Sequence, residues 1–398
     1  MRRVVLAVAA CLALAAPASA AAPPLATRLA QALAVPGLHP AASAAIAIDL
    51  ADGRVLFERN ADAPLAPASN EKLTVTFAAL EELGPDYRFA TQLLSTGHQV
   101  GSTWVGNVYL KGFGDPVLSS ADLAELVPQL QAQGITRIAG RVLGDQSWFD
   151  SLRTAPGWKA DYYVQQCAPI SALMVDGDVV GGRVALDPAL AATQRFRELL
   201  LRAGLAVGAA GVGTAPEEAF PLAQVDSEPL SQVLAQMDVP SDNRIAEMLI
   251  KDLGAEAAGR GTTAAGAAVV RHVLTAGRVP LRGVRIVDGS GLSLDDRLTA
   301  RAIATILIDA WNDPALRQPF WSALPVAGMT GTLQDRMERR PARGAVRAKT
   351  GTTDRASALS GYVRRRYAFA VVQNGWPVAT FAARLAQDRF ATALAAAE

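Results

Sequence analysis

Ser69-Asn70-Glu71-Lys72 opens a run with the spacing of a helix that continues to about Leu83. A serine and a lysine three positions apart at the start of a helix lie on one face, about one turn apart. A serine becomes a good nucleophile when a neighbouring base removes its proton. Lysine can be that base where its pKa is lowered, whereas arginine keeps its proton. This stretch therefore predicts a nucleophile and its base at a helix N-terminus.

Two further short motifs follow later in the chain. Residues 241–243 read Ser-Asp-Asn, an S-x-N pattern, and residues 349–351 read Lys-Thr-Gly. Only five lysines occur among the 38 basic residues, and Lys72 and Lys349 stand in these motifs. One S-x-x-K match could arise by chance, but the three motifs in this order are improbable as accidents. We expect them to meet in one site, where a charged Lys349 helps to lower the pKa of Lys72.

The segments around the motifs predict an antiparallel sheet flanked by helices. Residues 44–50 and 54–58 alternate as strands around Asp52-Gly53, a strong hairpin signal. Strands at 347–350, 357–363 and 367–372 follow with tight turns between them, which favours antiparallel pairing. The helices expected in this part span residues 25–33, 69–83, 229–237, 243–253, 264–275, 299–312 and 380–396.

A different pattern lies between the first and second motifs. Its predicted elements are strands at 89–94 and 104–110, a helix at 121–133, strands at 138–143 and 183–186, and a helix at 193–203. We interpret residues 86–235 as a smaller inserted α/β domain. Residues 21–85 and 236–398 would form the domain that carries the motifs, and the predicted fold class is mixed α+β.

Composition excludes several classes of protein. The chain has 398 residues, is 51% hydrophobic and has a net charge of +1, which fits a globular protein of two domains. A disordered chain would be less hydrophobic, and a nucleic-acid-binding protein would show a basic bias. The three histidines, His39, His98 and His272, are far apart in sequence, so we expect no metal site and no cofactor.

The N-terminus has the pattern of a cleavable secretory signal peptide. Arg2-Arg3 precedes an apolar run from Val4 to Ala16, and Ala18-Ser19-Ala20 has the form of a cleavage site. The apolar run is too short for a membrane span. We therefore predict export to the periplasm, with residues 1–20 removed and no integral membrane span. Cleavage would leave a single cysteine, Cys167, which we interpret as a small buried residue without a disulfide partner.

The motifs resemble those of the low-molecular-mass class C penicillin-binding proteins, the D-alanyl-D-alanine carboxypeptidase/endopeptidase family (peptidase family S13). The three together are the signature of serine enzymes that are acylated by D-alanyl peptides or β-lactams. The likeness covers about residues 40–375. Its further segments are G-x-G-D-P at 112–116, A-P-x-S-A-L at 168–173, S-x-N-x-x-A-E at 241–247 and D-G-S-G-L-S at 288–293.

The resemblance implies a transpeptidase domain like that of penicillin-binding proteins and serine β-lactamases, with an inserted domain. It also implies that peptidoglycan peptides and β-lactam antibiotics are the partners. By this resemblance, Ser69 attacks the D-Ala-D-Ala carbonyl and Lys72 takes its proton. Ser241 relays that proton to the departing D-alanine, and Asn243 holds the substrate's amide carbonyl.

The resemblance assigns the third motif to the end of the substrate. Lys349 supplies positive charge, while Thr350 and Thr352 bind the terminal carboxylate. Gly351 leaves room for the substrate at the strand edge. The N–H groups of Ser69 and Thr352 form the oxyanion hole.

Members of this family carry two inserted domains, whereas here the chain passes through Gly181-Gly182 with no room for the second. Two alternatives stay open. A serine β-lactamase shares the three motifs, but the class A type uses a glutamate in an E-x-x-L-N stretch that this sequence lacks. A non-catalytic wall-binding protein on the same fold would show damaged motifs, and these are intact. The oligomeric state is not predicted.

Overall fold

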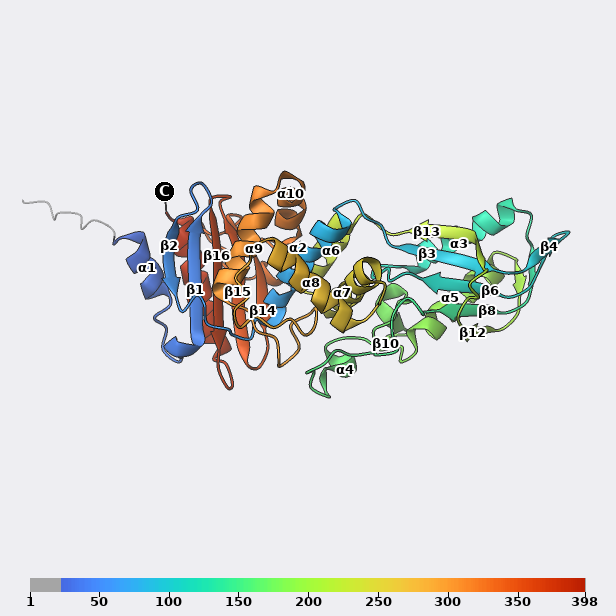
Figure 1. Ribbon diagram of the computed structural model, residues 1–398, viewed down its shortest axis with the longest axis horizontal. Helices are drawn as coiled ribbons and strands as arrows, with labels where there is room; N and C mark the ends of the chain where they lie inside the picture. The colour runs from blue at the N-terminus through green and yellow to red at the C-terminus, as the bar shows by residue number, and fades with distance from the viewer. Residues whose placement is uncertain (1–22, 398) are drawn as a thin grey trace, which may run out of the picture.

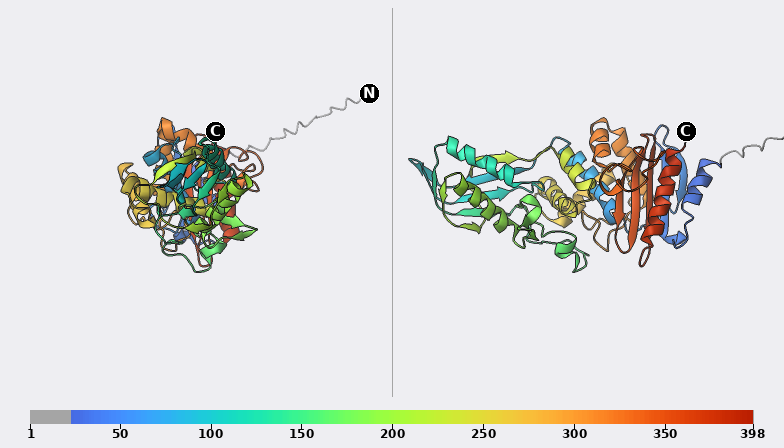
Figure 2. Two further views of the ribbon diagram at one scale, coloured as in Figure 1. Left: turned by 90° about the vertical axis from the view of Figure 1, so that its right-hand side faces the viewer. Right: turned by 180° about the vertical axis from the view of Figure 1, so that it is seen from behind.

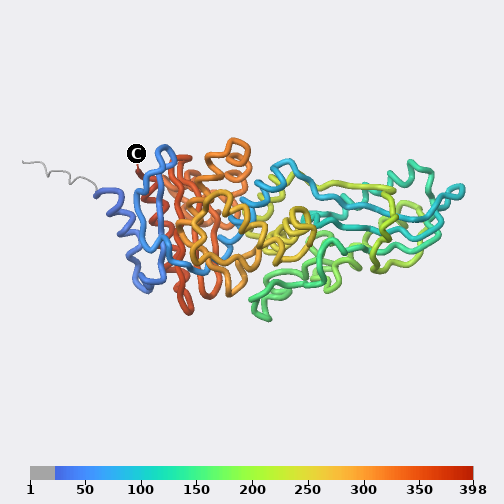
Figure 3. The backbone as a smooth tube through the Cα atoms, in the orientation of Figure 1, coloured from blue at the N-terminus to red at the C-terminus, as the bar shows by residue number. Residues whose placement is uncertain are grey.

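The computed structural model describes residues 23–397, so the predicted signal peptide lies outside the described residues. The molecule is elongated, with two parts arranged along its long axis (Figure 1). The larger part contains the first and last segments of the described chain. The chain leaves it after helix α2 and returns at helix α6, as the tube in Figure 3 traces. Within residues 23–397, no helix is both long and apolar enough to cross a bilayer.

A five-stranded antiparallel sheet forms the centre of the larger part. The strand order is β14-β15-β16-β1-β2, so β14 is an edge strand. Both β15 and β16 are buried almost throughout, which fits a sheet covered on its two faces. The predicted hairpin at Asp52-Gly53 joins β1 to β2. The strands span Ser43–Asp49 (β1), Val55–Arg59 (β2), Val346–Thr352 (β14), Ala356–Val363 (β15) and Tyr367–Asn374 (β16).

Helices cover both faces of this sheet. Helices α1 (Leu25–Ala32) and α11 (Thr380–Ala395) pack on one face, where Phe369 and Phe390 belong to a shared apolar core. Figure 2 shows α11 in red along the sheet in its right-hand view. The helices of the other face share a second core with Ala358, Tyr362 and Ala370. They are α2 (Lys72–Leu83), α6 (Leu230–Asp238), α7 (Asn243–Ala258), α8 (Thr263–Ala276), α9 (Ala300–Asn312) and α10 (Pro314–Ala323).

The smaller part has its own apolar core, drawn from residues 93–225. A mixed sheet of order β12-β8-β6-β3-β13 packs on helices α3 (Ser120–Ala132) and α5 (Pro188–Arg202). A second sheet of order β11-β7-β5-β4 lies beyond it. The strands are β3 (Ala90–Ser95), β4 (His98–Val100), β5 (Thr103–Val105), β6 (Val108–Gly112), β7 (Arg137–Ala139), β8 (Val142–Asp145), β11 (Ala206–Val207), β12 (Ala210–Val212) and β13 (Phe220–Asp226).

The predicted mixed α+β class is confirmed, but two predicted strands of the smaller part are wrong. The stretch 104–110 is divided between β5 and β6, and 138–143 between β7 and β8, so each half joins a different sheet. Gly106 at the first break has φ of +134°, a backbone conformation that residues other than glycine avoid. The expected bounds of the insert, 86 and 235, stay a prediction. Apolar contacts group helix α6 with the larger part.

Two features lie where the smaller part meets the larger one. A two-residue turn at Gly181-Gly182 joins the short strands β9 (Val179–Val180) and β10 (Arg183–Val184). Residues 150–167, which we call the strap, include the short helix α4 (Tyr162–Gln165) below the junction in Figure 1. The strap carries Cys167, whose side chain is buried, as expected, and has no disulfide partner within the described residues.

Candidate active site

The nucleophile candidate Ser69 lies in a short 3-10 helix, Ala68–Glu71, immediately before α2. This turn sits against the edge strand β14. The Asn70 side-chain amide donates a hydrogen bond to the Lys349 carbonyl oxygen at 3.1 Å, which ties the two elements together. The first and third motifs therefore lie side by side, as the sequence predicted.

Lys72 occupies the first turn of α2 and is fully buried. Its Nζ lies 3.2 Å from Ser69 Oγ, 2.8 Å from Asn243 Oδ1 and 2.8 Å from the Ser290 carbonyl oxygen. Burial lowers the pKa of Lys72, while the nearby carboxyl groups of Asp238, Asp288, Glu247 and Asp242 oppose that shift. A buried amine with a lowered pKa, in contact with a serine hydroxyl, has the properties of a general base.

Lys349 lies on β14 and is also fully buried. Its Nζ donates to the Thr350 carbonyl oxygen at 3.1 Å. Burial, together with the neighbouring Lys72, lowers the pKa of Lys349 to about 7, although Asp238 opposes this shift. Asp238 is itself buried and accepts a hydrogen bond from Thr76 at 2.7 Å. The expected positive charge of Lys349 stays a prediction, and with a pKa of about 7 that charge depends on pH.

The second motif is held at the start of α7. Asp242 caps this helix by accepting a hydrogen bond from the Ile245 amide at 3.0 Å. Asn243 contacts Lys72 through Oδ1 and donates from Nδ2 to the Gln166 carbonyl oxygen of the strap at 2.9 Å. Ser241 has φ of +68°, an uncommon conformation for a residue with a side chain. Within residues 23–397 its hydroxyl makes no hydrogen bond. Ser241 lines a cleft that Ser69 and Asn243 also line.

A cleft of about 460 Å³ joins the three motifs. Thr350 and Thr352 line it from β14, where the Thr350 hydroxyl lies 2.8 Å from that of Thr332 and Thr352 Oγ1 accepts from Arg384 at 3.4 Å. Sequence reasoning missed several of the lining residues. They are Gln166, Leu292, Gly331, Thr332, Gln334, Asp335, Arg336 and Arg384.

Gly351 packs closely against the backbone that carries the nucleophile. A Cβ at this position would lie 2.9 Å from the Pro67 carbonyl oxygen and 3.1 Å from the Ala68 Cβ. The glycine therefore allows β14 to approach the backbone that carries Ser69. The expected room for a substrate at the strand edge stays a prediction.

Buried carboxyl groups lie behind Lys72, around the D-G-S-G-L-S segment at 288–293. Glu247 Oε1 accepts from the amides of Gly289 at 3.1 Å and Ser290 at 2.8 Å. Asp288 accepts from the amides of Gly291 and Ser293, both at 2.7 Å. Burial raises the pKa of Glu247 to about 8, with Asp288 adding to the shift. Among residues 23–397, no group of three or more His, Cys, Asp and Glu side chains has the arrangement of a metal site.

The strap closes one side of this region. Trp158 donates from its indole to Asp288 Oδ2 at 2.8 Å, and the Gly157 carbonyl oxygen accepts from the Leu294 amide at 3.0 Å. Lys159 forms an ion pair with Asp354 in the turn between β14 and β15. The strap therefore contacts three parts of the site. They are the 288–293 segment, Asn243, and the turn that follows β14.

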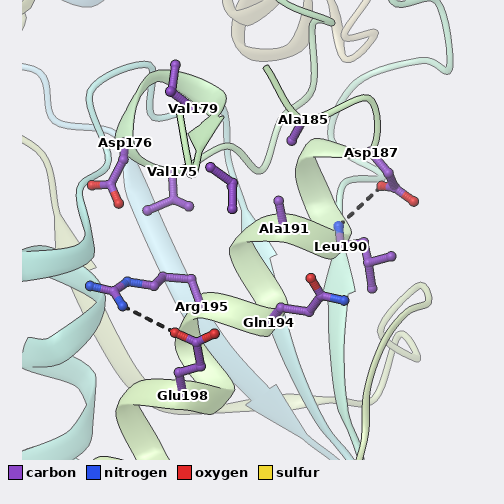
Figure 4. A pocket seen from close by; sticks show the side chains of 12 residues that line it. Val175, Asp176, Val179, Ala185, Asp187, Leu190, Ala191, Gln194, Arg195 and Glu198 are labelled. Carbon is purple, nitrogen blue, oxygen red and sulfur yellow. Dashed lines mark hydrogen bonds and ion pairs between the residues drawn. The ribbon is translucent and has the colours of Figure 1, made fainter. Parts of the chain in front are cut away.

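A cavity of about 420 Å³ lies away from these motifs, between the β9–β10 hairpin and α5 (Figure 4). Val175 and Val179 give it an apolar side, and Arg195 pairs with Glu198 at 3.3 Å on another. None of the motif residues lines it. The cleft at Ser69 is therefore the site where the chemistry of the motifs can take place.

Comparisons with known proteins identify the family of this chain and its fold. The family described as D-Ala-D-Ala carboxypeptidase 3 (S13) matches residues 25–186 and 181–397, two segments that meet at the β9–β10 hairpin. A D-alanyl-D-alanine carboxypeptidase of Actinomadura sp. is 33% identical, over 85% of this chain and 79% of its own length. A carboxypeptidase of Mycobacterium tuberculosis is 38% identical, over 80% and 72% of the two chains.

Solved structures show the same fold. Penicillin binding protein 4 from Haemophilus influenzae has a TM-score of 0.80 and 22% identity, over 92% of this chain and 97% of the other. A second structure of that protein contains a β-lactam and has a TM-score of 0.73. The predicted likeness to penicillin-binding proteins is thereby confirmed at the level of the fold. Because the family matches the chain along nearly its whole described length, the chain belongs to the D-Ala-D-Ala carboxypeptidase 3 (S13) family.

Proposed function

We propose that this protein is a penicillin-binding serine carboxypeptidase that hydrolyses the D-alanyl-D-alanine bond of peptidoglycan stem peptides through an acyl-enzyme on Ser69. The observation that carries the proposal is the contact of 3.2 Å between Ser69 Oγ and the buried Nζ of Lys72, whose pKa is lowered. Few structural roles require a buried lysine beside a serine hydroxyl, whereas nucleophilic catalysis does.

The first half of the reaction forms the ester. Ser69 Oγ attacks the carbonyl carbon of the penultimate D-alanine while its proton moves to Lys72 Nζ. The amides of Ser69 and Thr352 stabilise the negative charge that develops on the carbonyl oxygen. When the C–N bond breaks, the leaving D-alanine amine receives the proton from Lys72, with Ser241 as the relay.

The second half releases the product. A water molecule attacks the ester, gives up a proton to the same base, and frees Ser69 and the shortened peptide. A β-lactam acylates Ser69 in the same manner, and its ring opens instead of releasing an amine. Thr350 and Thr352 would bind the carboxylate that both kinds of ligand carry, and Lys349 would supply positive charge behind them. Arg384 supports this role, because its guanidinium contacts the Thr352 hydroxyl.

The cellular setting is part of the proposal. Residues 1–20 have the pattern of a signal peptide, so we place the mature protein in the periplasm, where peptidoglycan is the substrate. The cleft lies at the open edge of β14, where an extended peptide can add to a sheet. We extend the activity to D-alanyl cross-links, which present the same bond with a longer leaving group.

Digestion of purified sacculi with the wild type and with Ser69→Ala tests the proposal. We expect the wild type to remove terminal D-alanine and to open cross-links, and Ser69→Ala to do neither. Pentapeptides and cross-links that remain unchanged by the wild type would sink the proposal. Rapid turnover of nitrocefin would favour a β-lactamase instead, and the absence of labelling by fluorescent penicillin would favour a non-catalytic wall-binding protein.

A further inference from the structure

The three oxygen atoms around Lys72 Nζ differ in what they can do. The Ser290 carbonyl oxygen and Asn243 Oδ1 only accept hydrogen bonds, whereas the Ser69 hydroxyl both donates and accepts. A neutral amine has two N–H groups and one lone pair. When Lys72 is neutral, its two N–H groups are therefore directed to Ser290 and Asn243, and its lone pair faces the proton of Ser69.

The orientation of the Asn243 amide is fixed from outside the motif. Its Nδ2 donates to the Gln166 carbonyl oxygen at 2.9 Å. A flipped amide would place Oδ1 against that carbonyl and Nδ2 against the Lys72 amine, so both contacts would be lost. Asn243 therefore presents an acceptor to Lys72, and the strap enforces this choice.

The Ser290 carbonyl is fixed by two buried carboxyl groups. In a trans peptide the C=O and N–H point in opposite directions. The Gly291 N–H, which shares a peptide plane with the Ser290 C=O, donates to Asp288 at 2.7 Å. The preceding peptide is held by Glu247, which accepts from the Ser290 N–H at 2.8 Å. Both acids are fully buried, so water does not compete for these bonds.

We propose that Glu247 is a positioning residue for the general base, because it holds the two peptide N–H groups that precede the Ser290 carbonyl and so helps to place that carbonyl where the lone pair of neutral Lys72 is directed at Ser69. The inference rests on the proposed function, since it concerns the same proton transfer. Glu247 acts through Ser290 and Lys72 and touches no substrate.

The charge state of Glu247 fits this role. Burial and the neighbouring Asp288 raise its pKa to about 8, so it is mostly protonated at neutral pH. An ionised Glu247 would attract the Lys72 ammonium and raise the pKa of Lys72, which would disfavour the neutral base. Its Oε1 accepts both amide hydrogen bonds, while Oε2 has no partner among the described residues. Glutamine can reproduce this neutral acceptor, and methionine fills a similar volume without one.

The test compares Glu247→Gln with Glu247→Met by the pH profile of penicillin acylation at Ser69. For Glu247→Met we expect the plateau of the second-order acylation rate to fall at least about tenfold. The midpoint of the acidic limb should move to lower pH, because the Lys72 ammonium loses a well-placed acceptor and is easier to deprotonate. Glu247→Gln should restore both the plateau, to within about threefold of the wild type, and the midpoint.

A matched control separates positioning from stability. Asp252 is a buried carboxyl on the same helix, but it faces Gly114 in the smaller part. Asp252→Leu should lower the melting temperature and leave the midpoint of the acidic limb unmoved. If Glu247→Met does not fold, Glu247→Asp takes its place, with the same expected direction because its shorter carboxyl cannot reach both amides.

Each outcome decides the matter. A loss of plateau rate without a movement of the midpoint would mean a structural role only and would overturn the inference. So would a Glu247→Gln variant that behaves like Glu247→Met. Failure of the wild type to become acylated would instead overturn the proposed function, and this inference with it. A wild type that is acylated and a Glu247→Met variant with the same profile would remove this inference alone.

Discussion

The Cα atom of Gly351 lies so near the nucleophile that a Cβ there would be 3.0 Å from the Ser69 backbone nitrogen. That nitrogen carries one of the two proposed oxyanion donors. The third motif therefore contributes to the site by close backbone packing as well as by its side chains.

Gly351→Ala should displace the turn that carries Ser69. A shift of an ångström at a reacting group can lower the rate by about 100-fold, so we expect acylation by penicillin to fall about 10- to 100-fold. Stopped-flow measurement of acylation checks this. Gly213→Ala is the control, because its Cβ would meet only the Leu143 side chain at 3.4 Å or more. An unchanged rate in Gly351→Ala would contradict the packing argument.

Lys72→Arg should abolish acylation. Arginine keeps its proton at any working pH, and its larger head cannot fit among the three oxygen atoms that surround the buried amine. We expect a loss of at least about 1,000-fold, measured by fluorescent-penicillin labelling and mass spectrometry of Ser69. Lys111→Arg, a partly exposed lysine paired with Asp145 at 3.8 Å, should be labelled like the wild type.

The charge on Lys349 should appear in the pH dependence. With a pKa lowered to about 7, Lys349 is charged below that pH and loses its charge as the pH rises through it. A bound carboxylate favours the charged form and so raises this pKa in the complex. We therefore expect kcat/KM for a D-alanyl-D-alanine peptide to fall as the pH rises through about 7, while kcat does not fall. A β-lactam whose carboxylate is esterified should lack this limb. A kcat/KM that rises steadily from pH 6 to pH 9 for both ligands would argue against a titrating Lys349.

Lys251→Arg should destabilise the protein, although Lys251 stands in none of the three motifs. Lys251 is fully buried, pairs with Asp150 and donates to the Leu152 carbonyl oxygen at 3.0 Å. A bulkier head in a filled site typically costs about 1–3 kcal/mol. Thermal unfolding should show a lower melting temperature, against an unchanged value for Lys111→Arg. Equal melting temperatures for both variants would mean that the site has room to adjust.

The sequence predicted the sheet and the helices around the motifs well, because each is a long element with a clear period. Two strands of the smaller part were wrong for a local reason. Gly106-Asn107 marks the break, but apolar residues resume directly after it, so the pattern predicts one continuous strand. Helix α10 was missed because two prolines in ten residues argue against a helix. Pro314 stands in the first turn, where a proline is compatible with a helix, and Pro319 lies inside it.

The site was predictable where side chains of a known type carry the chemistry. The contact of Ser69 with Lys72 follows from a spacing of three, and the nearness of Lys349 is what the family resemblance implies. The carbonyl oxygens of Ser290 and Gln166 could not be predicted, because every residue has one and only the fold selects which is used. The lowered pKa of Lys349 was also out of reach, since it depends on burial and on a second amine brought close by folding.

The strap has a consequence for how such proteins change over time. Gln166 orients Asn243, and Trp158 contacts Asp288, so a segment joined to the smaller part completes the site in the larger one. An exchange of the whole insert between relatives would replace these partners together with the outer sheets. Sequence change is therefore restricted at residues 150–167, which contact the site, whereas the outer end of the smaller part is free to vary. The turn at Gly181-Gly182 lies outside the restricted segment.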